Sequence, residues 1–190
     1  MAQARIAKFR PEQLDDEQRA VYDAIAGGPR AQGPQLFRLR DDDGGLEGPF
    51  NAFLLQPQLG LALHEVGSAV RYRTALSDRA REIAILVVSQ HWDSSFERYA
   101  HEAVGRHVGL TDDELAGLRE QRYDALPDDE RLVAETALRL CAEGDLDDTA
   151  YADAVAGLGE SGLFELLTLV GYYAALALQL RVFRVTAPDA

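Results

Sequence analysis

The chain has 190 residues, 47% of them hydrophobic and 27% charged, with a formal net charge of -13. This length and composition are typical of one globular domain, residues 1–190, with a sizeable core. The negative charge argues against a nucleic-acid partner and against an anionic membrane surface. The N-terminus lacks an apolar signal-peptide region, and the single cysteine, Cys141, cannot form an intrachain disulfide, so we expect a cytoplasmic protein.

The first quarter of the chain is predicted to contain a loose arm, one helix and a long loop. Residues 1–10 show no regular pattern, and we expect them to form the arm. Pro11 opens a helix with a weak apolar stripe, which ends at Gly27-Gly28-Pro29. Residues 29–49 are rich in Gly, Pro and Asp and predict a loop. Loops of this length are often functional, so this one is expected to cover a site or a neighbouring subunit.

The rest of the chain is predicted to be helical throughout, because apolar periodicity and capping residues alternate with short breaks. The expected segments are Pro49–Leu55, Pro57 to Arg73, a helix from Ser77, Ser94 to Gly109, Thr111 to Glu120, Pro127 to Gly144, Asp147 to Leu158, and Ser161 to Val182. We find no repeat and no convincing strand, so the fold class is all-α with roughly eight helices. The apolar run Leu166–Leu178 is too short to cross a bilayer and is expected to be a core helix.

Two adjacent helices form the expected centre of the fold. The first starts after Ser77, a good N-cap, and continues through the apolar run 83–88, which leaves no polar face and should be buried on all sides. The β-branched residues in this run also allow a short buried strand, but the length of the pattern favours a helix. The second helix starts at Ser94, where Ser94 and Glu97 fit a capping box, and Gly109 ends it.

Ionisable side chains point into this central pair. On the second helix, Glu97 and His101 fall on the same side as the apolar residues. The link between the helices is short, so they should pack antiparallel and bring Glu82 close to His101. Buried charges must pair, shift their pKa or take part in chemistry, so these three residues are the predicted catalytic group. The structural alternatives are a helix cap for Glu97, an arginine partner for Glu82 and a core hydrogen bond for His101.

Other residues are candidates for substrate binding. Arg71, with Arg73 nearby, is placed to bind a substrate carboxylate, although arginines at this position are more often on the surface. Trp92 lies at the turn between the central helices, where it lines a pocket or fills the turn. Tyr172 lies in a very apolar helix, where a satisfied core hydroxyl is the alternative. Two carboxylates and a histidine are a legitimate metal-ligand set, but the spacing is a weak signal, and we expect no metal and no other cofactor.

The central motif resembles the carboxymuconolactone decarboxylase and alkylhydroperoxidase D-like family. The likeness extends from about Gly48 to Tyr173, with its centre at residues 81–83 and 96–102. The peroxidase branch has a Glu, then two cysteines separated by two residues, then a His four residues after the second cysteine. Glu82 and His101 match the Glu and the His, whereas Ser94 and Glu97 stand at the cysteine positions.

The resemblance implies an alkylhydroperoxidase D-like fold and a homo-oligomer, trimeric or hexameric. Turnover through a dithiol is excluded, because neither Ser94 nor Glu97 can form a disulfide. We therefore expect a cofactor-independent lyase of the decarboxylase branch that acts on a small carboxylated or lactone substrate. In this expectation a protonated His101 stabilises the developing charge and delivers a proton. The alternatives are a non-catalytic oligomeric ligand-binding protein and, less favoured, a metal-dependent enzyme.

Overall fold

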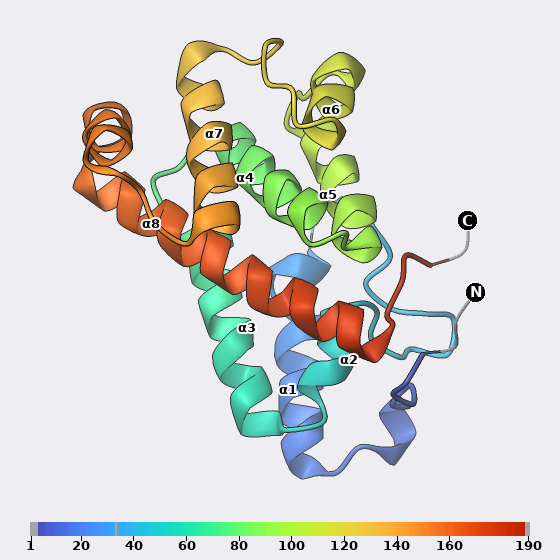
Figure 1. Ribbon diagram of the computed structural model, residues 1–190. Coiled ribbons are helices and arrows are strands. Elements are labelled where there is room, and N and C mark those ends of the chain that lie inside the picture. Colours follow the sequence, from blue (N-terminus) through green and yellow to red (C-terminus); the bar gives the residue numbers. More distant parts are fainter. Residues whose placement is uncertain (1–3, 33, 189–190) are drawn as a thin grey trace.

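The computed structural model describes residues 4–32 and 34–188, and this part of the chain is helical (Figure 1). It contains eight α-helices and two short 3-10 helices; its only β pairing is an isolated bridge between Arg40 and Leu46. The all-α prediction is therefore confirmed. The helices are η1 (Pro11–Gln13), α1 (Asp16–Ala26), η2 (Pro29–Ala31), α2 (Pro49–Phe53), α3 (Pro57–Tyr72), α4 (Asp78–His91), α5 (Ser95–His107), α6 (Asp112–Arg119), α7 (Asp128–Glu143) and α8 (Asp148–Phe183).

The helix α4 lies at the centre of the molecule and packs against α5, α6, α7 and α8. Every residue from position 80 to position 89 is buried, as expected for a helix without a polar face. Ser77 is its N-cap and accepts a hydrogen bond from the backbone N–H of Ala80 at 3.1 Å. The interpretation of this run as a helix is confirmed, and the strand alternative is wrong.

The N-terminal region differs from the prediction in two respects. Pro11 opens only the 3-10 turn η1, and α1 begins after Asp15, which forms a capping box with Gln18. Residues 4–10 also contact the body rather than forming a loose arm: the backbone N–H of Phe9 donates to Asn51 Oδ1 at 2.9 Å. The backbone N–H of Arg5 donates to the carbonyl oxygen of Phe183 at 2.9 Å. Arg5 therefore lies beside the C-terminal end of α8.

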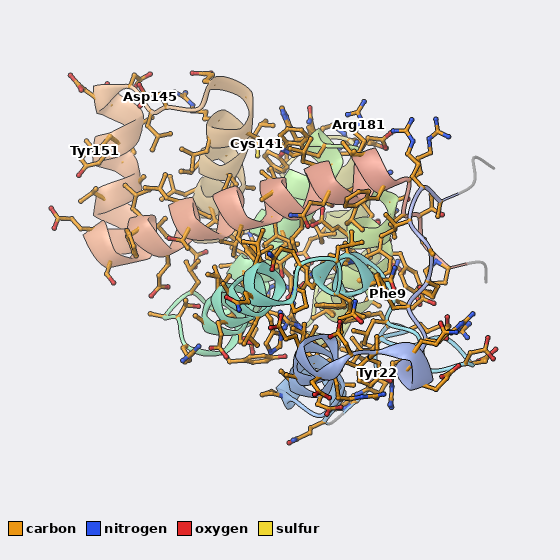
Figure 2. The ribbon with its side chains drawn as sticks, turned by 90° about the horizontal axis from the view of Figure 1, so that it is seen from below. Phe9, Tyr22, Cys141, Asp145, Tyr151 and Arg181 are labelled. Carbon is orange, nitrogen blue, oxygen red and sulfur yellow. The ribbon has the colours of Figure 1, made fainter. Side chains whose placement is uncertain are left out.

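The segment α8 consists of two helices joined at Gly159, whose backbone angles, φ 70° and ψ 166°, are not helical. The break that the sequence predicts between Leu158 and Ser161 is thus confirmed. Figure 2 shows the first half, marked by Tyr151, standing beside α7, while the second half runs on toward Arg181. That second half lies across the molecule between α1–α3 and α4–α7 (Figure 1).

By length and composition α8 is apolar enough to cross a membrane. However, half of its most apolar window is buried against the rest of the protein. Leu166, Leu169 and Ala177, for example, have no exposed surface. This packing is that of a core helix, in agreement with the interpretation of the run Leu166–Leu178.

Candidate functional site

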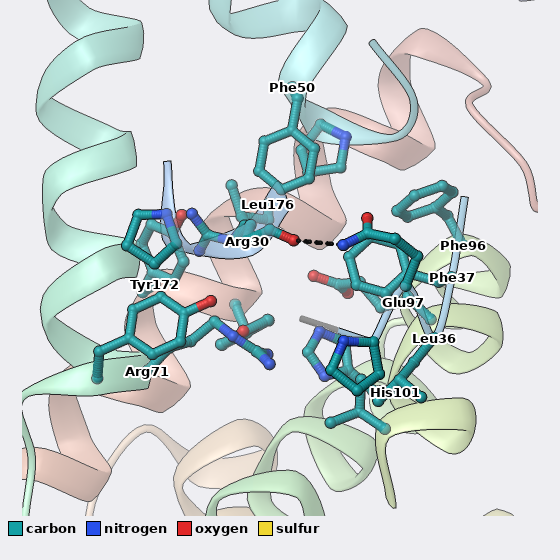
Figure 3. Close-up of a pocket in the computed structure, with 18 of the residues that line it drawn as sticks. Arg30, Leu36, Phe37, Phe50, Arg71, Phe96, Glu97, His101, Tyr172 and Leu176 are labelled. Carbon is teal, nitrogen blue, oxygen red and sulfur yellow. Dashed lines mark hydrogen bonds between the residues drawn. The ribbon is translucent and has the colours of Figure 1, made fainter. Parts of the chain in front are cut away.

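A cavity of about 180 Å³ lies beside α5 and the second half of α8, and the loop after α1 covers it (Figure 3). Its walls are largely apolar and aromatic, with a few polar groups, as is typical of small-molecule sites. The loop predicted over residues 29–49 contributes residues on both sides of position 33, up to Phe37, and also Pro49 to the cavity wall. The lining residues are Pro29, Arg30, Gln32, Pro34, Gln35, Leu36, Phe37, Pro49, Phe50, Arg71, Tyr72, Phe96, Glu97, Ala100, His101, Val104, Tyr172, Tyr173 and Leu176.

Glu82 and His101 form a buried pair at the inner end of this cavity. Glu82 Oε2 lies 2.6 Å from His101 Nδ1, so α4 and α5 bring these residues together as the sequence predicts. Burial alone would raise the pKa of Glu82, but the attraction of His101 and Arg71 outweighs it and keeps this pKa below its ordinary value. Burial lowers the pKa of His101, and the Glu82 carboxylate only partly offsets this effect. At neutral pH Glu82 is therefore an anion, and it accepts a hydrogen bond from the Nδ1–H group of a neutral His101.

This tautomer leaves His101 Nε2 unprotonated. Within the part of the chain that the structure describes, no hydrogen bond reaches Nε2. The Tyr173 ring packs edge-on against the imidazole, with ring centroids 5.2 Å apart, and fixes its plane. A histidine oriented by a carboxylate through Nδ1 and open at Nε2 is arranged to act as a base toward a molecule in the cavity.

Glu97 is the second ionisable residue of α5 in the cavity wall. Its side chain is 2% exposed, and neither carboxyl oxygen has a hydrogen-bond partner among the described residues. Burial raises the pKa of Glu97 to about 8. The nearby Ser94 hydroxyl slightly opposes this shift, but its geometry falls short of a hydrogen bond, because Ser94 Oγ is itself a buried atom without a partner. At neutral pH Glu97 is a neutral carboxylic acid that faces the cavity.

The capping box predicted at the start of α5 is wrong. Ser94 occupies the N-cap position, but its side chain makes no cap hydrogen bond, and Glu97 turns into the cavity instead. By contrast, the same motif at Thr111 and Glu114 forms as predicted. The difference lies in burial: at α5 the apolar face that contains Phe96 and Ala100 packs inward and takes Glu97 with it. The cap therefore does not explain Glu97.

Arg71 extends from the end of α3 toward His101 and Glu97 (Figure 3). Its Nη1 lies 3.4 Å from Glu82 Oε1, so its charge is balanced by the carboxylate behind His101. Arg71 is thus the arginine partner of Glu82. Arg79 instead pairs with Glu114 and Glu130, and Arg81 pairs with Asp78.

A second arginine, Arg30, lies in the loop that covers the cavity. Its Nη1 is 3.3 Å from Nδ1 of the buried His64, and its guanidinium carbon is 5.2 Å from the centroid of the Phe50 ring. Among the described residues, Arg30 forms no ion pair with a carboxylate. No pattern in the sequence points to this residue, because its position depends on how the loop folds back over α3.

The remaining candidates divide between the cavity and other parts of the protein. Tyr172 lines the cavity, and its hydroxyl lies so close to Gly67 that a Cβ there would overlap it. Trp92 is not among the residues that line the cavity; it packs against the core at the end of α4, in the manner of the stated alternative, a residue that fills the turn. Arg73 is exposed and pairs with Glu65. Over residues 4–32 and 34–188, no group of three or more His, Cys, Asp or Glu side chains is arranged to hold a metal ion.

No family model matches the chain, and no curated protein matches its sequence. Solved structures do match its fold. An alkylhydroperoxidase AhpD core protein from Ralstonia eutropha JMP134, an uncharacterized peroxidase-related protein, superposes with a TM-score of 0.75 at 14% identity, over 98% of this chain and 93% of that one. A protein of unknown function from Agrobacterium tumefaciens, a putative antioxidant defence protein AhpD, gives 0.67 at 18% identity, over 76% of this chain and 100% of that one.

A third similar structure is a variant of the debrominase Bmp8 in complex with 2,3,4-tribromopyrrole. It has a TM-score of 0.73 at 11% identity and covers 98% of this chain and 95% of that one. These likenesses define the fold: the chain is an all-helical protein with the alkylhydroperoxidase D-like fold. The site differs from a dithiol centre, because Ser94 and Glu97 replace the two cysteines of the peroxidase motif and Glu97 supplies a buried acid instead.

Proposed function

We propose that the protein is a cytoplasmic, cofactor-independent enzyme that carries out acid–base chemistry, of the lyase or decarboxylase type, on a small carboxylated or lactone substrate. The observation that carries this proposal is Glu97, a buried carboxyl group without a partner in the same cavity as His101. A buried polar group left unpaired costs about 1–3 kcal/mol. A ligand that accepts a proton or a hydrogen bond from Glu97 removes this cost.

The proposed chemistry assigns different roles to the two groups. Glu97, protonated at neutral pH, is the acid, and His101 Nε2, held by Glu82, is the base. In a decarboxylation, the bond between the carboxylate and the adjacent carbon breaks, its electron pair stays on that carbon, and CO₂ leaves. Glu97 then transfers its proton to the carbon, and water returns a proton to Glu97. Where the substrate also has a hydroxyl group or an acidic C–H group, His101 Nε2 accepts that proton and later releases it to water. This assignment replaces the expectation that a protonated His101 is the donor, because burial lowers the pKa of His101.

The structural comparisons support chemistry on a small molecule in this fold. The debrominase that shares the fold was crystallised with 2,3,4-tribromopyrrole, a five-membered ring compound. A cavity of about 180 Å³ is of the same order as the roughly 150 Å³ cavity that admits benzene in an engineered protein. A substrate with one small ring therefore fits the space. A peroxidase cycle is not part of the proposal, because the dithiol is missing.

The test measures proton transfer and does not require that the natural substrate be identified first. The protein is incubated in D₂O with a set of small keto acids, unsaturated carboxylic acids and lactones, and NMR follows loss of the carboxylate and incorporation of deuterium. We expect turnover of at least one compound, with a drop of about 100-fold or more for Glu97→Gln and for His101→Gln. Glu102→Gln, on the same helix but outside the cavity, is the matched control and should stay within about two-fold of wild type.

A second candidate is a non-catalytic ligand-binding protein, favoured by the loss of the cysteine pair. The same experiment separates the two. If a compound binds, as shown by a thermal shift, but wild type and both variants give identical NMR traces, the enzyme proposal is wrong and the binding protein is supported.

A further inference from the structure

The cavity contains more positive than negative charge. Arg71 and Glu82 balance each other at 3.4 Å, and His101 is neutral beside them. Glu97 is the acid in the cavity wall, and it is also neutral at neutral pH. The charge of Arg30 therefore has no counter-ion among the described residues of the cavity.

The fold holds this unpaired cation in a fixed position. His64, 5% exposed, accepts from Arg30 Nη1 through Nδ1, which requires the neutral form of the imidazole. The guanidinium also stacks near the Phe50 ring, a favourable cation–π contact. Gly67 leaves room for it, because a Cβ at this position would lie 3.0 Å from Arg30 Nη2. A neutral imidazole, an aromatic face and a glycine position the arginine without neutralising it.

We propose that Arg30 makes the cavity selective for anionic ligands. Arg30 binds the carboxylate of a small ring-containing monoanion, and His64 holds the Arg30 side chain in position. That the bound molecule is a substrate rests on the proposed function, whereas the binding of a carboxylate by Arg30 does not depend on it. One carboxylate balances the one unpaired cation, and Arg binds carboxylates through two parallel hydrogen bonds. The rings of Phe37, Phe50 and Phe96 then pack against the apolar part of the ligand.

The first experiment compares charged ligands with neutral ones of the same shape. Isothermal titration calorimetry at pH 7.5 measures the Kd of benzoate and 2-furoate, and of benzamide and 2-furamide. We expect wild type to bind each carboxylate at least ten-fold more tightly than its amide. Arg30→Gln should abolish this preference, and Arg30→Lys should keep part of it. Arg73→Gln, which removes an exposed arginine outside the cavity, is the matched control and should keep it in full.

The positioning role of His64 is tested by the same ratio. His64→Phe removes the acceptor, and we expect the preference for carboxylate to fall at least three-fold. His64→Gln retains an acceptor and should restore most of it. A role of His64 limited to packing predicts the opposite order, because Phe fills the buried space better than Gln.

Two outcomes overturn the proposal: a wild type without preference for the carboxylates, or an Arg30→Gln variant that keeps the preference. Repeating the titration with Glu97→Gln and His101→Gln separates this proposal from the proposed function. If wild type turns over no compound and these variants keep the preference for carboxylates, the enzyme proposal is wrong and the proposal for Arg30 is supported. If wild type turns over a carboxylic acid but binds acids and amides equally well, the enzyme proposal is supported and the proposal for Arg30 is wrong.

Discussion

Glu97 is neutral at neutral pH because α5 buries its carboxyl group where no protein donor among the described residues stabilises the charge. The pKa of about 8 makes stability depend on pH. Below the ordinary value of 4.5 the group is protonated in the folded and in the unfolded chain. Between 4.5 and about 8 the unfolded chain ionises while the folded chain keeps its proton, so the contribution of Glu97 to stability falls as pH rises.

We therefore predict that Glu97→Gln becomes more stabilising, relative to wild type, as pH increases. In wild type, keeping Glu97 protonated in the folded chain lowers the unfolding free energy by roughly 1.4 kcal/mol for each pH unit above 4.5. The variant avoids this loss, so its advantage in unfolding free energy reaches about 4–5 kcal/mol above pH 8. Urea unfolding at pH 5, 7 and 8.5 measures it. Glu102→Gln, on the same helix but outside the cavity, is measured alongside as the matched control. A Glu97→Gln difference that does not change between pH 5 and pH 8.5 contradicts the assignment of a buried neutral acid.

The candidate site could be predicted in part, and the part that was predicted has a clear physical basis. Glu82 and His101 meet because a helix period and a short link fix their relative positions, and both are local properties of the chain. Arg30 could not be found in this way, since a loop position depends on contacts with residues far along the chain. Trp92 illustrates the same limit: its place at the turn follows from the sequence, but whether that turn borders the cavity depends on tertiary packing, and Trp92 is not among the lining residues.

At the scale of the helices, capping residues predicted most boundaries. Ser77, Thr111 and Gly144 mark the ends of their helices as expected, because a cap acts through its own turn and needs no tertiary contact. Two predictions failed where a competing contact was stronger. Asp15 offers α1 a better start than Pro11, and burial of the inner face of α5 turned Glu97 away from its cap.

The bend in α8 supplies a prediction with an internal control. Gly159 adopts backbone angles that are essentially restricted to glycine, yet a Cβ there would meet nothing within 4 Å. The cost of Gly159→Ala is therefore backbone strain alone, and we expect a loss of stability of about 1–3 kcal/mol. Gly171, in the helical second half of α8, also has open space around it. Gly171→Ala should stabilise by about 0.5–1 kcal/mol.

Thermal or urea unfolding of the two variants measures this contrast. Opposite signs are the expected result. If Gly159→Ala is as stable as Gly171→Ala, the two halves of α8 can form one continuous helix, and the bend is not required by the fold.

At the scale of the whole molecule, one arginine joins three helices. Arg79 on α4 binds Glu130 on α7 through two hydrogen bonds of 2.8 Å and Glu114 on α6 through one of 2.7 Å. Both carboxylates are about nine-tenths buried. Removing the cation from buried carboxylates is costly because their charge stays behind without a partner.

We predict that Arg79→Met lowers the unfolding free energy by about 3 kcal/mol, near the low end for a buried pair because Arg79 is 26% exposed. Adding Glu130→Gln to this variant removes one stranded charge and should recover part of the loss. Arg131→Met, which removes a half-buried arginine that pairs with the exposed Asp128, should cost less than about 1 kcal/mol. An equal effect of Arg79→Met and Arg131→Met in urea unfolding would show that the network contributes little.

The outer face of the second half of α8 bears on the oligomeric state. Phe164, Leu167, Leu178 and Val182 lie on this face and are 44–70% exposed. Their positions along the helix place them on one side, in an apolar stripe about 27 Å long. Such exposed apolar surfaces mark interaction sites, and each copy of the chain presents the same stripe. We propose that copies of the chain associate through it, which agrees with the homo-oligomer that the resemblance implies.

Light scattering coupled to size-exclusion chromatography tests this proposal, and wild type should have the mass of a trimer or a hexamer. Phe164→Glu combined with Leu178→Glu places charges on the stripe and should shift the mass to that of a monomer. Tyr151→Glu, an exposed aromatic on the other half of α8, should leave the mass unchanged. A monomeric wild type would contradict the proposal, and an oligomer that survives the double substitution would place the interface elsewhere. Because the same half of α8 carries Tyr172 and Leu176 in the cavity wall, association would also restrict the motion of that wall.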